Sequence, residues 1–424
     1  MSRAADPTSP LRVVPVPAEH VADFEAVDDI TWFDEQPPPG RRHVEALDPD
    51  RLRAATRDGA PPYLGIYATD VVPLTVPGPG ETLTQVPADA LTWVAVHPDH
   101  RRRGVLSTMI AAQLREAHDA GLALACLHAS ESAIYGRFGY GAVGTSLTLT
   151  VPSGRAIDAP GIDDSDVTTE LRTVDQGEVG ALLHELQHRF AAGTLGQVGL
   201  TERRNLHYSV DDPAWLRGKE RQRVLIARRG EDVVGYCILR REGKWEGGGP
   251  AGVLHLGSHG YADDAAELAI LRRLLSFDLI AKVELRKLAV DSPVPWWLGG
   301  LRGLDVQASE ALWLRVVDVP AALTARGYAA PVDVVLEIED DLCPWNAGHW
   351  RLTVGDDGRA TCAPTSDPAD LGLSVRTLGV AFLGGRTVRD LRRQGVILER
   401  TPGAAAALHA AMAASHQPIG ANDF

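Results

Sequence analysis

Hydrophobic positions in the first third of the chain change their spacing several times, which predicts strands alternating with helices. Residues 104–121, GVLSTMIAAQLREAHDAG, place apolar side chains three and four positions apart, and Gly121 stands where a C-terminal cap belongs. The runs on either side, LTWVAV at 91–96 and LALACLHAS at 122–130, are apolar without regular polar alternation, as in strands covered on both faces. This order predicts a strand-helix-strand unit.

Further elements of the same region follow from the same patterns. Strands are predicted at 62–76 and 146–151, and a short helix is predicted in SAIYGRFGY, 132–140. The first 150 residues therefore form an α/β segment.

A weaker repeat of this order follows in the middle of the chain. Residues 224–241 are predicted to form a hairpin, and residues 253–288 a strand, a loop, a helix and a strand. Laid beside 94–96, the sequence of 254–256 makes this second unit look like a degenerate copy of the first. The copy lacks the Arg-Arg-Arg-Gly loop that precedes the first helix.

Two stretches rich in proline and glycine, 151–166 and 292–305, interrupt the periodic pattern. They predict three domains, at 1–155, 156–300 and 301–424. The last of these is predicted to be α+β, with strands followed by helices. Its strands are predicted at 311–319, 334–340 and 349–354, and its helices at 385–395 and 401–416.

Composition is that of a soluble globular protein, with 45% hydrophobic and 23% charged residues and no apolar run of the roughly 20 residues that a membrane span needs. The net charge of -14 disfavours nucleic acid and anionic membranes as main partners. The four cysteines lie far apart and form no C-x-x-C pair, so we expect no disulfide framework and no metal. The N-terminus lacks the apolar stretch of a secretory signal, which predicts a cytoplasmic protein.

Candidate chemistry lies in VAVHPDHRRRGV, 94–105, where a strand ends at a proline and a basic run leads through Gly104 into the predicted helix. Backbone N–H groups of the loop and first helical turn would then point at an anion, and Gly104 would let a phosphate approach closely. The arginines add charge-assisted donors. On these residues alone, a solvated basic loop remains the alternative.

This stretch resembles the acetyl-CoA motif of the GNAT N-acetyltransferases, Gln/Arg-x-x-Gly-x-Gly/Ala. Arg101, Gly104 and Leu106 occupy its positions, and Leu106 departs from the small last residue. Together with HASESAIYGRFGYG at 128–141, the chain resembles the Eis-type acetyltransferases, in which a GNAT domain, a degenerate GNAT domain and a sterol-carrier-like domain follow one another. The resemblance implies a homohexamer as well.

The resemblance implies that acetyl-CoA is the co-substrate and names the residues that contact it. The pantetheine arm would bind an exposed strand edge, the pyrophosphate would bind the loop and first helical turn, and two residues after the neighbouring strand would lie near the cofactor. The three sets are Val94, Ala95 and Val96; Arg102, Arg103, Gly104, Val105, Leu106 and Ser107; and Ser130 and Glu131.

Acetyl transfer to an amine needs a base for the ammonium proton and an acid for the departing thiolate. By the resemblance, Tyr135 is the general acid and the carboxylate of Phe424 is the general base. From the residues alone, Tyr135 is more readily interpreted as a packing aromatic and Phe424 as a frayed terminus, and only the resemblance reverses this. Tyr140, in the same block, is interpreted as packing, and His128 as a core residue.

For the acceptor, VDDITWFDEQPPPG at 27–40 offers acidic residues beside aromatic ones, which suits a polyamine by charge and cation–π attraction. Trp32, Phe33 and Asp34 are the candidate substrate residues; solvated acids at a helix end are the alternative. The favoured function is acetylation of multi-amine small molecules such as aminoglycosides. Acetylation of protein or peptide lysines, and a non-enzymatic lipid or ligand carrier, are the competing classes.

Overall fold

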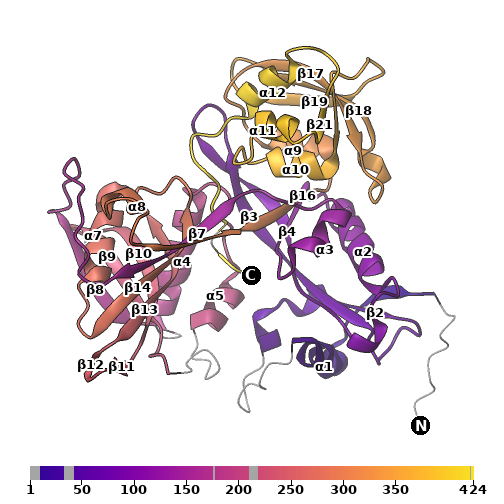
Figure 1. Cartoon of the computed structure of the whole chain (residues 1–424). Coiled ribbons are helices and arrows are strands. Elements are labelled where there is room, and N and C mark those ends of the chain that lie inside the picture. The colour runs from indigo at the N-terminus through magenta and orange to yellow at the C-terminus, as the bar shows by residue number, and fades with distance from the viewer. Residues whose placement is uncertain (1–9, 33–42, 175–176, 210–217, 421) are drawn as a thin grey trace, which may run out of the picture. The chain divides into compact units, whose positions relative to one another are not determined.

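The computed structural model describes residues 10–32, 43–174, 177–209, 218–420 and 422–424. The chain forms two compact units (Figure 1). Unit 1 comprises residues 1–143, 313–414 and 424, and unit 2 comprises residues 144–312 and 415–423.

A seven-stranded sheet in the order β1-β2-β3-β4-β5-β16-β6 organises the first part of unit 1. Neighbouring strands from β1 to β4 are antiparallel, whereas β4 and β5 are parallel. The strands are β1 (Arg12–Pro15), β2 (Leu52–Thr56), β3 (Gly65–Pro77), β4 (Leu83–Val96), β5 (Leu124–His128), β16 (Leu312–Val316) and β6 (Gly141–Ala142).

Helices cover both faces of this sheet. Successive side chains of a strand point to opposite faces, so neighbouring residues of β2 and β3 pack against different helices. Ala54 and Ile66 pack in one cluster with Phe24 of α1 (Val21–Trp32). Ala55 and Tyr67, one position further along each strand, belong to a second cluster. That second cluster contains α2 (Val105–Asp119), which confirms the predicted helix, and α3 (Ser132–Tyr135).

Strand β16 joins this sheet from a segment about 170 positions further along the chain than β6. It pairs with β6 through Trp313 and Ala142, and Val317 just beyond it donates its N–H to the carbonyl of Ala123, at 2.9 Å. The rest of unit 1 is a five-stranded sheet, ordered β19-β18-β17-β20-β21, with four helices and one short 3₁₀ turn. These elements are β17 (Val332–Glu339), β18 (Gly348–Val354), β19 (Ala360–Pro364), β20 (Leu371–Ser374), β21 (Ile397–Glu399), α9 (Val319–Ala325), α10 (Val375–Ala381), α11 (Val388–Arg393), α12 (Ala404–Met412) and η6 (Pro344–Asn346).

Unit 2 is built on a second seven-stranded sheet, ordered β15-β7-β14-β13-β10-β9-β8. Like the first sheet, which pairs β4 with β5 in parallel, it contains a parallel pair, here β13 with β14, beside antiparallel ones. Its strands are β7 (Thr145–Pro152), β8 (Val167–Thr173), β9 (Arg223–Arg229), β10 (Asp232–Glu242), β13 (Gly252–Tyr261), β14 (Ile280–Ala289) and β15 (Asp305–Glu310). A small hairpin, β11 (Trp245–Glu246) and β12 (Gly249–Pro250), extends from β10.

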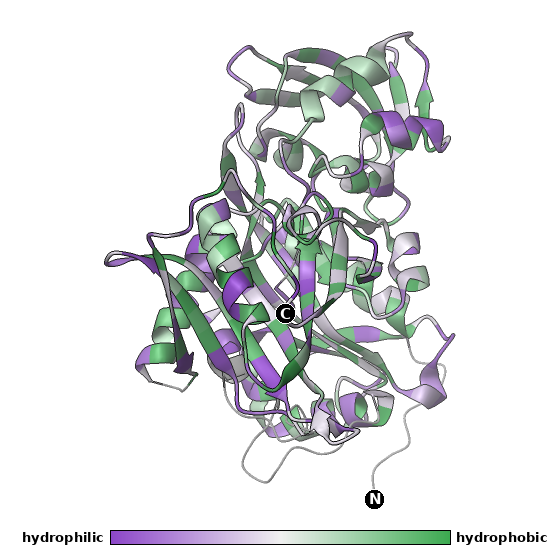
Figure 2. Ribbon diagram, turned by 60° about the vertical axis from the view of Figure 1, so that its left-hand side comes forward, coloured by the Kyte–Doolittle hydropathy of each residue, from purple (hydrophilic) through white to green (hydrophobic). Residues whose placement is uncertain are grey.

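Helices again pack on both faces of this second sheet. One cluster joins the sheet to α7 (Asp264–Leu275) and α8 (Val294–Trp297), and another joins it to α4 (Glu178–Ala192). The helix α5 (Glu202–Ser209) follows α4. Figure 2 shows hydrophobic residues along the strands of the sheets, with hydrophilic residues among them. The mixed α/β architecture confirms the predicted fold class.

Candidate active site

Strands β4 and β5 separate in the middle of the first sheet. Their parallel pairing ends at Ala90 and Cys126. In β4 a bulge follows, because Ala68 pairs with Thr92 and Ile66 pairs with Ala95, so that two residues of β4 oppose one of β3. Beyond Ala90, the edge of β4 that faces β5 carries no ladder among the described residues and can accept an extended ligand.

The predicted pantetheine residues lie on this free edge. Val94 is one of the two bulged residues, beside Trp93, whose φ is 54°. Ala95 is buried, while Val94 and Val96 are half-buried. The bulge re-aims the backbone at the point where the two strands part.

The loop after β4 has the shape of an anion site. The imidazole of His97 accepts the N–H of Asp99 and caps the short turn η4 (Pro98–His100). Gly104 has a φ of 82° and no side-chain cap stands at the start of α2, so the first N–H groups of the helix remain available. A Cβ built on Gly104 would meet no atom within 4 Å. Open space therefore lies beside these N–H groups.

Side chains around the loop suit a pyrophosphate. Arg102, Arg103 and Ser107 are exposed next to the start of α2. Leu106, which departs from the GNAT pattern, packs against the core between α2 and the sheet instead. The backbone of the first turn carries the anion-binding groups, so a larger residue is accommodated here.

Tyr135 is the last residue of α3, which begins at Ser132, directly after the exposed residues Ser130 and Glu131. Its side chain is only 7% exposed. Burial, with a contribution from the charge of Glu131, raises the pKa of Tyr135 to about 12. The phenol is therefore protonated at neutral pH and can donate a proton.

A buried polar chain behind Tyr135 escaped the sequence analysis. The ring of Tyr140 meets that of Tyr135 edge-on, with centroids 6.1 Å apart. The hydroxyl of Tyr140 donates to Gln113 at 3.0 Å, and the Gln113 amide donates to Asp89 at 2.6 Å. Burial raises the pKa of Asp89 to about 6 against the opposing effects of Gln113 and Arg51. Tyr140 thus packs as predicted, but as a member of a hydrogen-bonded chain.

Contacts from β16 and from the chain that follows it hold the turn after Tyr135, η5 (Gly136–Phe138). Arg315 of β16 is fully buried; it donates to the carbonyl of Phe138 at 2.9 Å and to both carboxylate oxygens of Asp340, at 2.8 and 2.7 Å. Gly139, with a φ of 84°, leaves room for this arginine, since a Cβ there would lie 2.6 Å from its Nε.

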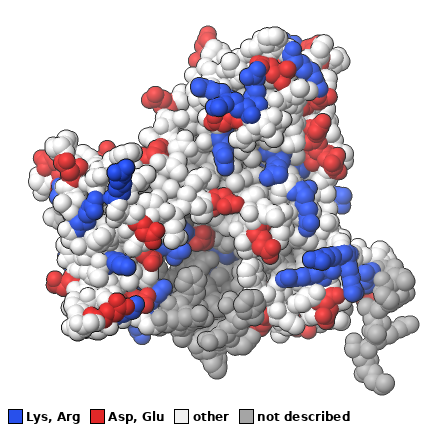
Figure 3. All heavy atoms as spheres, in the orientation of Figure 1, with Lys and Arg blue, Asp and Glu red and all other residues white. Residues whose placement is uncertain are grey.

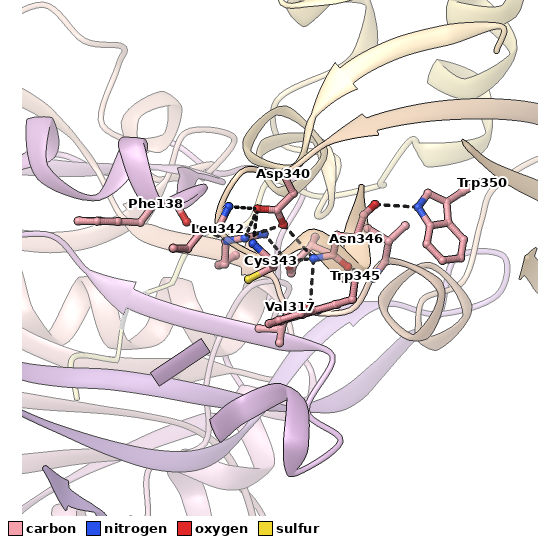
Figure 4. Close-up of polar contacts among 11 residues, drawn as sticks. Phe138, Val317, Asp340, Leu342, Cys343, Trp345, Asn346 and Trp350 are labelled. Carbon is pink, nitrogen blue, oxygen red and sulfur yellow. Dashed lines mark hydrogen bonds and ion pairs between the residues drawn. The ribbon is translucent and has the colours of Figure 1, made fainter. Parts of the chain in front are cut away.

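Asp340 and Asn346 extend the same network, as Figure 4 shows. Asp340 accepts the backbone N–H of Cys343 at 3.1 Å and the side-chain amide of Asn346 at 3.0 Å. Asn346 also donates to the carbonyl of Val317, which accepts the indole N–H of Trp345 as well. Each buried charge is therefore paired and hydrogen-bonded, which is the condition for a buried ion pair to be tolerated.

The C-terminal residue Phe424 contacts both separated strands. A terminal carboxylate oxygen accepts a hydrogen bond from the hydroxyl of Thr92 in β4, at 2.9 Å. The phenyl ring lies against the imidazole of His128 at the end of β5, with centroids 5.0 Å apart. His128 is only half-buried, so it does not have the fully enclosed environment of a core residue. The structure thus brings a carboxylate to the place where β4 and β5 part, beside the strand edge predicted to bind pantetheine.

The candidate substrate residues are only partly described. Trp32 ends α1 with its side chain 41% exposed. Phe33 and Asp34 lie outside the described residues. On the face seen in Figure 3, basic and acidic side chains are interspersed.

Among the described residues, no group of three or more His, Cys, Asp or Glu side chains is placed to hold a metal ion. Within the same part of the chain, no helix is long and apolar enough to cross a membrane.

Comparison with known proteins assigns each segment to a domain family. Residues 33–143 match one acetyltransferase (GNAT) domain family and residues 199–316 match another, while residues 319–419 match a sterol carrier protein domain family. The crystal structure of Eis1 from Mycobacterium abscessus is similar with a TM-score of 0.81 at 29% identity, covering 98% of this chain and all of that one. These matches define an enzyme of the GNAT N-acetyltransferase class.

Curated relatives narrow the class. The N-acetyltransferase Eis of Mycobacterium tuberculosis is 33% identical over 357 residues, which cover 81% of this chain and 82% of the relative. An uncharacterized N-acetyltransferase of Streptomyces coelicolor is 39% identical over 335 residues, covering 78% and 79%. The chain belongs to the Eis family of N-acetyltransferases.

Proposed function

We propose that this enzyme transfers the acetyl group of acetyl-CoA to amines of aminoglycoside-like, multi-amine small molecules. The observation that carries the proposal is the terminal carboxylate of Phe424, hydrogen-bonded to Thr92 where β4 and β5 part. The carboxylate at the free edge of β4 would supply the base, and the buried phenol of Tyr135 would supply the acid, that amine acetylation requires.

The two catalytic groups act on opposite sides of the transfer. The carboxylate of Phe424 takes a proton from the substrate ammonium, and the free amine then attacks the acetyl carbon. As the carbon–sulfur bond breaks, the phenol of Tyr135 gives its proton to the CoA sulfur, and the attacking nitrogen loses its second proton to the resulting tyrosinate as the amide forms. With its pKa raised to about 12, the phenol of Tyr135 is protonated at neutral pH and has a proton to give when the thiolate departs.

The remaining chain residues bind and orient. In this proposal the backbone of Val94, Ala95 and Val96 holds the pantetheine arm, and the loop from Arg102 to Ser107 holds the pyrophosphate, with Ser130 and Glu131 nearby. The open space at Gly104 and the uncapped start of α2 support this assignment. Trp32, with Phe33 and Asp34, is proposed to attract the cationic acceptor.

We also propose the domain boundaries at 155 and 300, a homohexameric assembly and a cytoplasmic location. The resemblance to Eis-type enzymes supports the hexamer, and light scattering of the purified chain tests it. A monomer at micromolar concentration would exclude it.

The test is release of free CoA thiol from acetyl-CoA against a panel of aminoglycosides, small polyamines and a lysine-containing peptide. The protein carries its native C-terminus. Turnover with aminoglycosides is expected. Turnover with the peptide alone would favour lysine acetylation instead, and acetyl-CoA binding without turnover on any amine would contradict the proposed acceptor class.

A further inference from the structure

The second GNAT domain repeats the strand separation of the first. In unit 2 the parallel pairing of β13 with β14 ends at His255 and Glu284. A bulge again lies just beyond, because Leu239 pairs with Leu256 and Cys237 pairs with His259, so that Gly257 and Ser258 together oppose Ile238. An opening of the kind that the first domain offers to a ligand therefore exists here too.

The helix after this opening cannot serve a pyrophosphate. The carboxylate of Asp263 caps α7 by accepting the N–H of Ala266 at 2.9 Å, so the helix start already has an anionic partner. Asp264 adds a second carboxylate in the first turn. Asp263 and Asp264 stand where α2 has Gly104 and its arginines, and their negative charges would repel a phosphate. This opening is therefore available to another ligand.

The chain's own tail occupies it. Asn422, 3% exposed, uses both ends of its side-chain amide: the oxygen accepts from Ser258 of β13 at 2.8 Å, and the nitrogen donates to the carbonyl of Val198 at 2.8 Å. Its backbone N–H donates to Gln197 at 2.8 Å. Next to it, Asp423 pairs with Lys287 of β14.

Recognition of Asn422 is specific to that side chain. An amide supplies one acceptor and one donor at the two partners; an aspartate of the same shape has no donor for Val198, and leucine has neither group. Tyr236 hydrogen-bonds Ser258 from behind, at 2.9 Å, and holds its hydroxyl in place. A buried amide that loses a partner leaves an unsatisfied polar group, so substitution is costly.

We propose that the opening between β13 and β14 is a receptor for the C-terminal tail, and that Asn422 is a positioning residue for the terminal carboxylate. Phe424 follows Asn422 by two residues, so anchoring Asn422 limits the excursion of the carboxylate. The receptor stands on unit 2 alone; its catalytic consequence rests on the proposed role of Phe424. The second GNAT domain, which would not bind the cofactor, would thus contribute to catalysis by holding the C-terminal end of the chain.

The test compares two amide-to-carboxylate changes in the same tail, Asn422→Asp and Gln417→Glu. Gln417 contacts the protein through its backbone N–H, which donates to Asp291, and its side chain is half-buried with no hydrogen bond described. Hydrogen exchange of the tail amides in the full chain is measured first. Asn422→Asp is expected to speed exchange at least tenfold, and Gln417→Glu to leave it within twofold.

A milder variant guards against misfolding. Ser258→Ala removes only the donor to the Asn422 oxygen and is expected to give an intermediate increase in exchange. Unchanged tail exchange in both Asn422→Asp and Ser258→Ala would overturn the receptor.

Thiol-release kinetics then separate the two proposals, with a chain lacking Phe424 as reference. We expect Asn422→Asp to lower kcat at least tenfold with the KM for acetyl-CoA within twofold, as the chain lacking Phe424 also should. A slow chain without Phe424 beside a fully active Asn422→Asp would overturn the positioning role. Full activity without Phe424 would instead overturn the carboxylate as base, while the exchange result still decides the receptor.

Discussion

At the scale of single residues, Tyr135 and Tyr140 show how neighbouring phenols take different roles. Tyr140 donates its hydroxyl to Gln113 and is fully enclosed. The hydroxyl of Tyr135 makes no hydrogen bond to the described part of the chain, and the residue lies beside the exposed Glu131. A phenol without an internal partner can give its proton to a ligand, whereas one that anchors a buried chain cannot without loss.

Replacing Tyr135 with phenylalanine should lower kcat for acetyl transfer by about 10²–10⁴-fold, the range for loss of a general acid. The matched control is Tyr140→Phe, which removes a buried hydrogen bond at a cost of about 1 kcal/mol in stability but leaves the proton donor. Thiol-release kinetics and thermal melting distinguish the two. A larger kcat loss in Tyr140→Phe would reverse the assignment.

Asp89 makes stability depend on pH. Its pKa in the folded state, about 6, lies above its ordinary value of 3.8, so between these pH values the folded state holds a proton that the unfolded state has lost. The stabilising contribution of the protonated Asp89 is fully present below pH 3.8 and is lost as the pH rises through 6. The free energy of unfolding should fall by about 3 kcal/mol over this range. The melting temperature of Asp89→Asn, relative to the native chain, should therefore rise from pH 4 to pH 7. A constant difference would refute this.

At the scale of elements, the junction of β4 and α2 combines a bulge, a 3₁₀ turn and a glycine with positive φ. Each device turns the backbone so that amide groups face outward rather than into a ladder or helix. The result is a ligand-facing backbone supported by a buried helix face, because Val105 and Met109 of α2 pack in the core.

Gly104→Ala should raise the KM for acetyl-CoA roughly tenfold or more, since the added Cβ enters the open space at the anion site and strains a backbone at positive φ. Gly121→Ala is the matched control: it has a φ of 74°, an equally open surrounding and a position at the other end of α2. Equal KM changes in both variants would show that strain alone, and not the ligand site, causes the effect.

The buried pair of Arg315 and Asp340 should dominate the stability of the turn after Tyr135. Arg315→Ala leaves a buried carboxylate uncompensated and is expected to cost about 3–5 kcal/mol. Arg351→Ala, which removes an exposed arginine from Asp333 and Asp367, should cost at most about 1 kcal/mol. Chemical denaturation followed by tryptophan fluorescence measures both, and similar losses would contradict the burial argument.

At the scale of the whole molecule, residues distant in sequence come together at the candidate active site. The hydrogen bond from Thr92 to Phe424 joins positions 332 apart. Strand β16 joins the first sheet although residues 144–312 of unit 2 separate the two in the sequence. Its Arg315 donates a hydrogen bond to the turn that follows Tyr135. Activity is therefore expected to respond to changes at the chain's end as strongly as to changes in the cofactor loop.

Extending the chain beyond Phe424 should lower kcat by at least tenfold, because it converts the terminal carboxylate into a neutral peptide group at the same place. An extension of equal length at the N-terminus is the control and should leave kcat within twofold. Steady-state thiol release measures both. Native turnover by a C-terminally tagged chain would remove Phe424 from the mechanism.

By itself, the sequence determined the local elements: the helix of 104–121, the strands on either side of it, the basic loop at its start and the repeat in the middle of the chain. These depend on spacing within a few residues. Only the tertiary structure decided the Asp89 chain, the entry of β16 and the anchoring of Asn422. Asp89 interrupts an apolar pattern, so its strand was predicted to begin at Leu91 rather than Leu83. Hydrogen-bond partners that lie hundreds of positions apart leave no local pattern in the sequence. Their contribution to stability depends on burial, which exists only in the folded chain.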